Sequence, residues 1–136
     1  MLALWRVADP GNVGTLLRTA DAFGAGVSLS EECADPTGPR ALRASAGAIF
    51  RVPLVRWEDV PERGVALVAH GGGPLSGVAL MPPLTIFLGS EREGLPESLA
   101  TSCYEATIAL PGQAESLNVA AAGAIALYEL SRRDDT

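Results

Sequence analysis

Hydrophobic and polar positions alternate along this chain in blocks that predict strands and helices in turn. Short apolar runs predict buried strands, and the segments between them carry apolar residues at helical spacing. The predicted strands span residues 2–7, 27–30, 52–57, 65–69, 84–88 and 104–109. The predicted helices span residues 12–23, 39–49 and 96–102, together with an alanine-rich stretch that closes the chain. Strands that alternate with helices are typical of an α/β domain with a mainly parallel sheet flanked by helices.

Glycine-rich loops follow three of the predicted strands. They are residues 70–73, residues 89–94, and the Pro111-Gly112 turn. Ligands of parallel sheets bind beyond the carboxyl ends of the strands, so we expect a ligand near these loops. Asn12 is predicted to cap the first helix and Ser116 the last, with Asn118 in the first turn of the last helix. An ordinary capped helix packed on the sheet is the alternative for that last helix.

Composition narrows the class of protein. The chain has 136 residues, 48% of them hydrophobic, which is enough for one domain with its own core. Its net charge of −6 argues against a generally basic nucleic-acid binder. Residues 36–57 nevertheless contain Arg40, Arg43, Arg51 and Arg56 and no acid. One interpretation is that these arginines bind phosphate, for which arginine is the better bidentate ligand. The alternative is a solvated face whose arginines reflect a general bias for arginine over lysine, because the chain has no lysine.

Other classes of site are excluded by what the chain lacks. Cys33 and Cys103 are far apart and His70 is the only histidine, so we expect no metal site. Two isolated cysteines suit a reduced, cytoplasmic protein. The apolar run from 117 to 128 is shorter than a membrane span. No Gly-x-Ser-x-Gly elbow accompanies His70, so we interpret it as a loop residue near a ligand rather than as a hydrolase residue.

Three segments resemble the motifs of one enzyme family, in the order in which the family has them. They are Asn12 to Ala25 (NVGTLLRTADAFGA), Leu88 to Leu95 (LGSEREGL) and Ile108 to Ala120 (IALPGQAESLNVA). The family is that of the SpoU (TrmH-type) RNA 2′-O-ribose methyltransferases, of the SPOUT class. Arg43 to Ala48 (RASAGA) also fits the family's Ser-x-Gly segment. The resemblance covers essentially the whole chain.

The resemblance implies a fold and an assembly. The fold is an α/β sheet with a C-terminal trefoil knot, in which S-adenosylmethionine lies bent in the knotted region. The small residues of the last helix, from Ala120 to Ala126, suit such close threading. The family's active sites form at a homodimer interface. Val13, Leu17 and Phe23 of the first helix and the alanine-rich last helix offer more apolar face than one small domain needs, so we expect them to form that interface. We expect residues 1–136 to form one methyltransferase domain without the N-terminal RNA-binding domain that many relatives carry, either as a minimal protein or as a domain of a longer one.

The function implied is transfer of a methyl group from S-adenosylmethionine to a ribose 2′-OH of tRNA or rRNA. The resemblance assigns catalysis to Arg18, Asn12, Glu91, Ser116 and Asn118. It assigns the cofactor to Leu88, Gly89, Ile108, Leu110, Leu117, Ser116 and Asn118. We expect RNA contacts from Arg18, Arg40, Arg43 and Ser45. No metal is needed, because a sulfonium methyl is already electrophilic.

Arg18 has an unusual place in this expected mechanism. A guanidinium stays protonated, so Arg18 suits a clamp on the target phosphate better than a general base. The structural alternative is a surface ion pair with Asp21, three residues on. The alternative for the whole chain is a knotted, dimeric, cofactor-binding module without RNA methylation activity, which the acidic charge favours.

Overall fold

Six parallel strands form one sheet in this computed structural model, which describes residues 1–61, 63–79 and 83–132. The strand order is β2-β1-β5-β3-β6-β4, and every paired strand runs parallel to its neighbour. The strands are β1 (Leu2–Leu4), β2 (Val27–Leu29), β3 (Gly64–Leu67), β4 (Gly73–Pro74), β5 (Thr85–Leu88) and β6 (Tyr104–Thr107). The predicted α/β class with a parallel sheet is confirmed.

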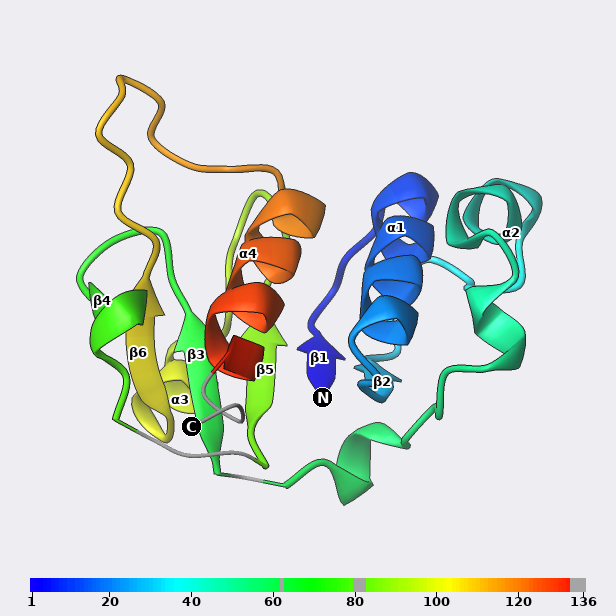
Figure 1. Cartoon of the computed structure of the whole chain (residues 1–136), viewed down its shortest axis with the longest axis horizontal. Helices are drawn as coiled ribbons and strands as arrows, with labels where there is room; N and C mark the ends of the chain where they lie inside the picture. Colours follow the sequence, from blue (N-terminus) through cyan, green and yellow to red (C-terminus); the bar gives the residue numbers. More distant parts are fainter. Residues whose placement is uncertain (62, 80–82, 133–136) are drawn as a thin grey trace.

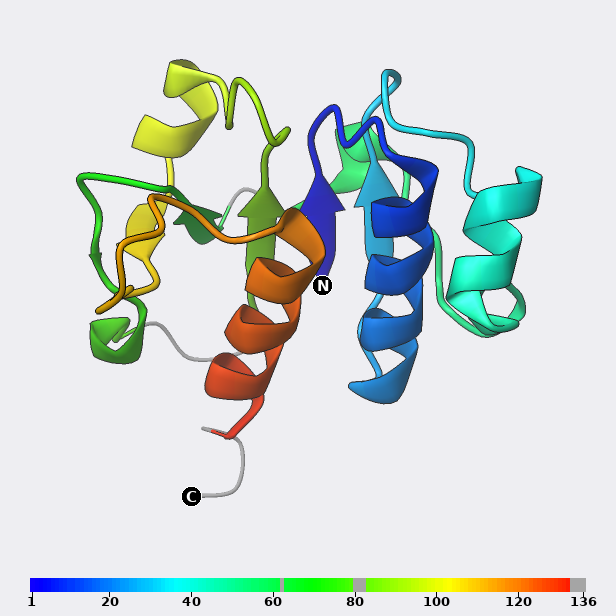
Figure 2. The same cartoon turned by 90° about the horizontal axis from the view of Figure 1, so that it is seen from above.

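Helices cover both faces of the sheet. The α-helices are α1 (Pro10–Ala22), α2 (Pro39–Ser45), α3 (Glu97–Thr101) and α4 (Val119–Ser131). Short 3-10 helices span Ala48–Phe50, Trp57–Asp59 and Leu75–Gly77. α1 and α4 lie side by side over one face, with α2 beside α1 (Figure 1). α3 lies on the opposite face of the sheet (Figure 2).

The core forms where these layers meet. Leu2, Leu4 and Val65 of the central strands are fully buried, because strands covered on both faces need apolar side chains on both. α1 adds Val13, Leu16, Leu17 and Ala20 at helical spacing, and all four are fully buried. Val13 and Leu17 therefore pack inside one chain, and the prediction that they form a dimer surface is wrong. Of the three residues predicted for that surface, only Phe23 is exposed, at 40%.

Some element boundaries differ from the predictions for local reasons. Residues 52–57 form no strand; they make a single bridge between Leu54 and Val27 before the turn at Trp57. Pro53 lies within this segment and has no N–H to donate to a ladder. β4 was not predicted, because a two-residue strand after a run of glycines has no apolar pattern. The predicted helix 39–49 ends at Ser45, where Ala46 adopts a left-handed conformation with a φ of 50°.

Both long helices begin at a residue other than the one predicted. The side chain of Asp9 caps α1 by accepting from the backbone N–H of Asn12, at 2.9 Å. Pro10 at the first helical position fits this start, because its missing N–H has no helical partner to lose. Asn118, and not Ser116, caps α4. These two corrections place Asn12 and Asn118 at neighbouring helix N-termini.

Candidate active site

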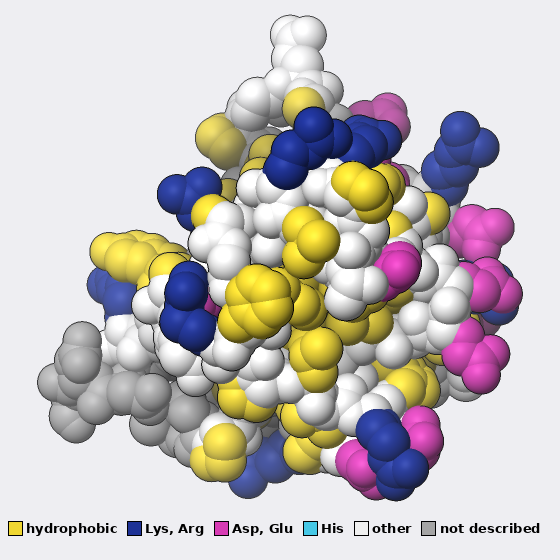
Figure 3. All heavy atoms as spheres, turned by 90° about the vertical axis from the view of Figure 1, so that its right-hand side faces the viewer, with side chains coloured by type: hydrophobic (Ala, Val, Ile, Leu, Met, Phe, Trp, Pro, Cys, Tyr) yellow, Lys and Arg dark blue, Asp and Glu magenta, His cyan; other side chains and the backbone are white. Residues whose placement is uncertain are grey.

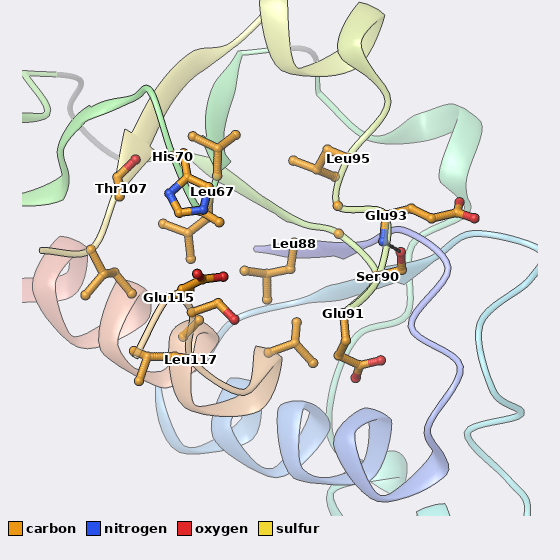
Figure 4. A pocket seen from close by; sticks show the side chains of 18 of the residues that line it. Leu67, His70, Leu88, Ser90, Glu91, Glu93, Leu95, Thr107, Glu115 and Leu117 are labelled. Carbon is orange, nitrogen blue, oxygen red and sulfur yellow. Dashed lines mark hydrogen bonds between the residues drawn. The ribbon is translucent and has the colours of Figure 1, made fainter. Parts of the chain in front are cut away.

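A cavity of about 480 Å³ opens at the carboxyl ends of β3, β5 and β6. Figure 4 shows its lining, with Leu67, Leu88 and Leu117 around the apolar part. His70 and Thr107 lie together at one end, and Glu91 at the other. The walls therefore combine an apolar floor with polar groups at the two ends. This is the composition expected of a small-ligand site at the carboxyl edge of a parallel sheet.

The turn at 89–94 forms one wall of this cavity. It closes with the N–H of Gly94 donating to the carbonyl of Ser90 at 2.9 Å, and the N–H of Glu93 donating to the Ser90 hydroxyl at 3.1 Å. A Cβ on Gly89 would lie 2.3 Å from the carbonyl carbon of Gly94. No side chain fits there without opening the turn. Gly89 thus allows the turn to fold back on β5 and present Glu91.

A chain of hydrogen bonds connects the three segments that carry the resemblance. The Oδ1 of Asn118 accepts from the backbone N–H groups of Ala120, at 2.8 Å, and Ala121, at 3.2 Å. Its Nδ2 donates to the Oδ1 of Asn12 at 3.1 Å. The Nδ2 of Asn12 in turn donates to the Oε1 of Glu91. We call this chain, from Asn118 through Asn12 to Glu91, the amide relay.

The amide relay has only one consistent direction. The free N–H groups at the start of α4 require an acceptor, so the Asn118 oxygen faces the helix and its NH₂ faces outward. This orientation makes Asn12 accept from Asn118 and donate to Glu91. Glu91 is left as an acceptor, the role of an ionised carboxylate. The helix start thereby fixes the position of a carboxylate at the cavity rim.

Apart from Ser45, which is buried, the predicted site residues fall into three groups in the structure. Those that line the cavity are Leu88, Gly89, Glu91, Ile108, Leu110, Ser116 and Leu117. Asn12 and Asn118 are held in the amide relay and are not part of the lining. Arg18, Arg40 and Arg43 are exposed on α1 and α2 and do not line the cavity.

Two RNA-contact predictions change in this light. Ser45 is fully buried and its hydroxyl donates to the carbonyl of Leu42 at 3.1 Å, so it is not presented to any ligand. Arg18 makes no ion pair with any residue that the structure describes. The carboxylate of Asp21, its expected alternative partner, pairs with Arg51 at 2.7 Å instead. Arg18 therefore stands free on the outer face of α1.

Sequence reasoning missed some of the lining. Leu67 ends β3, which pairs with β5, and Thr107 ends β6, on the other side of β3. Glu115 precedes the predicted Ser116. A signal was available, because the last residues of parallel strands face the ligand edge of a sheet. The loop residues 71–73 and Pro111-Gly112, which we expected near the ligand, are absent from the lining.

Comparisons with known proteins identify the family. A sequence model of the SpoU rRNA Methylase family matches residues 1–128, which include every residue of the cavity and of the amide relay. The chain belongs to the SpoU methylase family. The resemblance seen in its three motifs is confirmed, and the parallel sheet is that of SpoU methyltransferase structures. The trefoil knot stays a prediction.

Individual relatives in this family are similar over nearly the whole chain. The 23S rRNA (guanosine(2553)-2′-O)-methyltransferase RlmP of Bacillus subtilis is 35% identical over 96% of this chain and 57% of its own. The AdoMet-bound rRNA methyltransferase from Sinorhizobium meliloti is 38% identical, with a TM-score of 0.88, over 98% of this chain and 55% of its own. A structure described as giving insight into the 2-OH methylation of C/U34 on tRNA is 28% identical, with a TM-score of 0.89, over 99% of this chain and 90% of its own.

The chain spans about half the length of the curated SpoU relatives it matches. None of the helices described here is long and apolar enough to cross a membrane. Within residues 1–61, 63–79 and 83–132, no three His, Cys, Asp or Glu side chains gather as metal ligands would.

Proposed function

We propose that this chain transfers a methyl group from S-adenosylmethionine to a ribose 2′-OH of tRNA or rRNA. The amide relay is the observation that carries the proposal. It fixes Glu91 at the rim of a cavity whose volume, about 480 Å³, lies within the usual range for small-ligand sites. Two relatives are named as 2′-O-methyltransferases of 23S rRNA, and a similar solved structure is that of an AdoMet-bound rRNA methyltransferase.

The cavity residues fit this cofactor. Leu67, Leu88 and Leu117 offer apolar contacts for an adenosine. Three carboxylates and one arginine line the same cavity, namely Glu91, Glu93, Glu115 and Arg92. This excess of negative charge favours a sulfonium cation over its neutral thioether product. When bound, the cofactor would supply an electrophilic methyl group for the 2′-oxygen, and the neutral thioether would be the leaving group.

The chain's own residues then position the ribose and its proton. Glu91 accepts the hydrogen bond of the 2′-OH and takes up its proton as the oxygen gains the methyl group, and the amide relay keeps the carboxylate oriented for that contact. Arg18 binds the phosphate beside the target ribose and stabilises the charge that develops on the 2′-oxygen. Ser116 and the backbone at Gly89 hold the cofactor. Most of the rate enhancement then comes from positioning, because the methyl group is already activated.

RNA is the partner expected on the side of α2. Leu42, Phe50 and Leu54 are exposed in this part of the molecule, and Phe50 is 86% exposed. Figure 3 views the molecule from this side, where arginine side chains lie above and to the left of exposed hydrophobic ones, and carboxylates lie to the right. Arg43 is exposed, and the Arg40 side chain lies 3.7 Å from the carboxylate of Asp9. Such a surface suits phosphates and unstacked bases.

A homodimer is proposed from the outer face of α4. No charged residue occurs from Val119 to Tyr128, and Ile125 and Tyr128 are 41% and 57% exposed. A helix that is apolar on all sides is normally buried, so we infer that a second copy covers this face. Ile125→Glu should halve the mass measured by light scattering, while Thr15→Glu on the outer face of α1 should not. A monomeric wild-type protein at micromolar concentration would contradict the dimer.

Calorimetry with S-adenosylmethionine and its demethylated product tests the cofactor. We expect one site per chain, and no binding by Gly89→Val, because a side chain there opens the 89–94 turn. Gly38→Ala is the matched control, since its Cβ would meet only the Asp35 carbonyl at an ordinary 3.4 Å. Wild-type protein that binds neither ligand would overturn the proposal.

The second candidate function is a dimeric cofactor-binding module that does not methylate RNA. The net charge of −6 favours it, because few basic residues give little affinity for RNA. If the full-length natural protein binds the cofactor but does not transfer a methyl group to RNA, the binding-module function is correct. In either case the two free cysteines suit a reduced compartment such as the cytoplasm.

A further inference from the structure

Arg6 has a left-handed backbone conformation, with a φ of 52°, two residues after β1. Ala46 is the only other non-glycine residue with a positive φ among those described, and its conformation ends α2 as a helix cap does. Arg6 ends no helix. A residue with a side chain is strained in this region relative to glycine. The contacts of Arg6 must therefore favour this conformation.

Those contacts join three loops at the carboxyl edge of the sheet. The guanidinium lies 5.1 Å from the centre of the Trp5 ring and its Nε lies 3.1 Å from the carboxylate of Glu32, in the loop after β2. Its Nη1 lies 3.9 Å from the carboxylate of Glu93, in the turn after β5. The backbone N–H of Arg6 donates to the Ser30 hydroxyl at 2.8 Å.

The contact between Arg6 and Glu93 involves a residue that lines the cavity. Glu93 belongs to the 89–94 turn, which also contains Glu91, the acceptor of the hydrogen bond from Asn12. The side chains of Glu91 and Glu93 leave this turn in different directions (Figure 4). The turn is therefore contacted twice from the start of the chain, by Arg6 in the segment that connects β1 to α1 and by Asn12 in the first turn of α1. Two contacts on different sides fix the orientation of a short turn better than either alone.

We propose that Arg6 is a positioning residue that holds the 89–94 turn in the shape that the cofactor cavity requires. The identity of the cofactor rests on the proposed function, but the effect of Arg6 on the turn does not. A single exposed ion pair contributes little to the stability of a whole protein. It is sufficient to shift the equilibrium of an exposed six-residue turn, because such local openings require little free energy.

Arg6→Gly separates positioning from stability. Glycine accepts the left-handed backbone, so the melting temperature should not fall. The turn should loosen, and the amides of Glu93 and Gly94, which donate to Ser90, should exchange hydrogen faster in the ligand-free protein. The Kd for S-adenosylhomocysteine should rise three- to tenfold, on the order expected for one exposed pair with an added cation–π contact. Ala46→Gly relieves the same kind of strain far from the turn, and should change neither exchange nor Kd.

Glu93→Gln provides the second arm of the test. If Arg6 acts through Glu93, adding Arg6→Gly to this variant should change exchange and Kd much less than it does in the wild type. Equal effects in both backgrounds, or unchanged exchange and Kd, would overturn the proposal. Lost RNA methylation with unchanged exchange and Kd would also overturn it, and would indicate that Arg6 contacts RNA. Wild-type protein that binds no cofactor would contradict the proposed function, and the exchange measurement alone would then decide the role of Arg6.

Discussion

α1 and α4 are two helices of thirteen residues that lie side by side on the same face of the sheet, yet their outer faces differ. The outer face of α1 carries Thr15, Arg18 and Ala22. The outer face of α4 carries Ala121, Ile125 and Tyr128. α1 has the ordinary pattern of a surface helix, with its apolar residues turned to the core. α4 has apolar residues on both sides, which is the pattern of a helix between two surfaces.

α1 and α4 contribute to the site at their N-termini, and their exposed faces suit different partners. Their N-termini lie together and share the amide relay through Asn12 and Asn118. Beyond that meeting point α1 presents Arg18, which has no ion-pair partner among the described residues and suits a polyanionic substrate. α4 presents an apolar surface, which suits a second protein chain. One end of the helix pair therefore builds the site, and the exposed faces select different partners.

The largest expected effect concerns the outer face of α1. Arg18→Ala should reduce methyl transfer to RNA by about a hundredfold or more, the usual scale for losing one placed donor at a transition state. Cofactor affinity should remain nearly unchanged, because Arg18 does not line the cavity. Arg18→Lys should restore little, since a point charge does not replace a bidentate fork. Tritiated methyl incorporation measures this, with Arg56→Ala as the control. Equal rates for wild type and Arg18→Ala would remove Arg18 from the mechanism.

The buried glycines of the two helices sharpen the comparison. A Cβ on Gly14 of α1 would lie 2.4 Å from the carbonyl oxygen of Ala41, in the backbone of α2. A Cβ on Gly123 of α4 would meet the side-chain ends of Leu16 and Leu88, at 2.5 and 2.9 Å. A backbone carbonyl held in a helix can move less than a leucine methyl group to relieve a close contact. Gly14→Ala should lower the free energy of unfolding by about 2–3 kcal/mol, whereas Gly123→Ala should stay within about 1 kcal/mol, helped by alanine's helix propensity. Urea denaturation compares them, and equal losses would contradict this account of the packing.

The two helix caps should also differ in what they support. Asn118→Asp keeps an oxygen for the N–H groups of Ala120 and Ala121 but loses the donor to Asn12. Methyl transfer should fall by roughly tenfold, equivalent to about 1.4 kcal/mol, while the melting temperature stays near that of the wild type. Asp9→Asn keeps the α1 cap without touching the amide relay, and should leave the rate unchanged. Retained activity in Asn118→Asp would show that the amide relay is structural only.

The smallest expected effect is a pH dependence at the end of α1. The hydrogen bond from Arg51 holds the pKa of Asp21 below its ordinary value of 3.8. A carboxylate whose pKa is lowered on folding stabilises the native state above its unfolded pKa, and this contribution is lost as the pH falls through the folded value. The melting-temperature difference between wild type and Asp21→Asn should therefore shrink from pH 6 to below pH 3.8. A difference that is constant over this range would contradict a role for the pair.

Periodicity predicted the layers of this fold because the strands and long helices are apolar where they are buried. The predicted first helix differs from α1 by a few residues at its start, where Asp9 and Asn12 are equally good caps by type. The strand predicted at 52–57 fails because apolar content alone does not supply pairing, and Pro53 lacks the N–H that a ladder needs. Gly73–Pro74 gives no strand signal, and its pairing depends on where β6 happens to lie.

Part of the candidate site could likewise be predicted from the sequence, and part depends on tertiary contacts. Leu88 ends β5 and Ile108 directly follows β6, so their place at the cavity follows from strand order and direction. Motif spacing cannot predict the amide relay, because Asn12 and Asn118 are 106 residues apart and meet only through tertiary packing. Arg6 gives no sequence signal either, since its left-handed backbone depends on partners in two other loops. Ser45 matches a motif and is nevertheless buried.

The central claim is that this site methylates a ribose 2′-OH of RNA in the cell. The most direct measurement maps 2′-O-methyl groups in tRNA and rRNA from cells with the gene, without it, and with it restored as wild type or Arg18→Ala. The account predicts at least one 2′-O-methylated nucleotide that is lost on deletion, returns with the wild-type gene and does not return with Arg18→Ala. A 2′-O-methylation map that is the same in all four strains would contradict it.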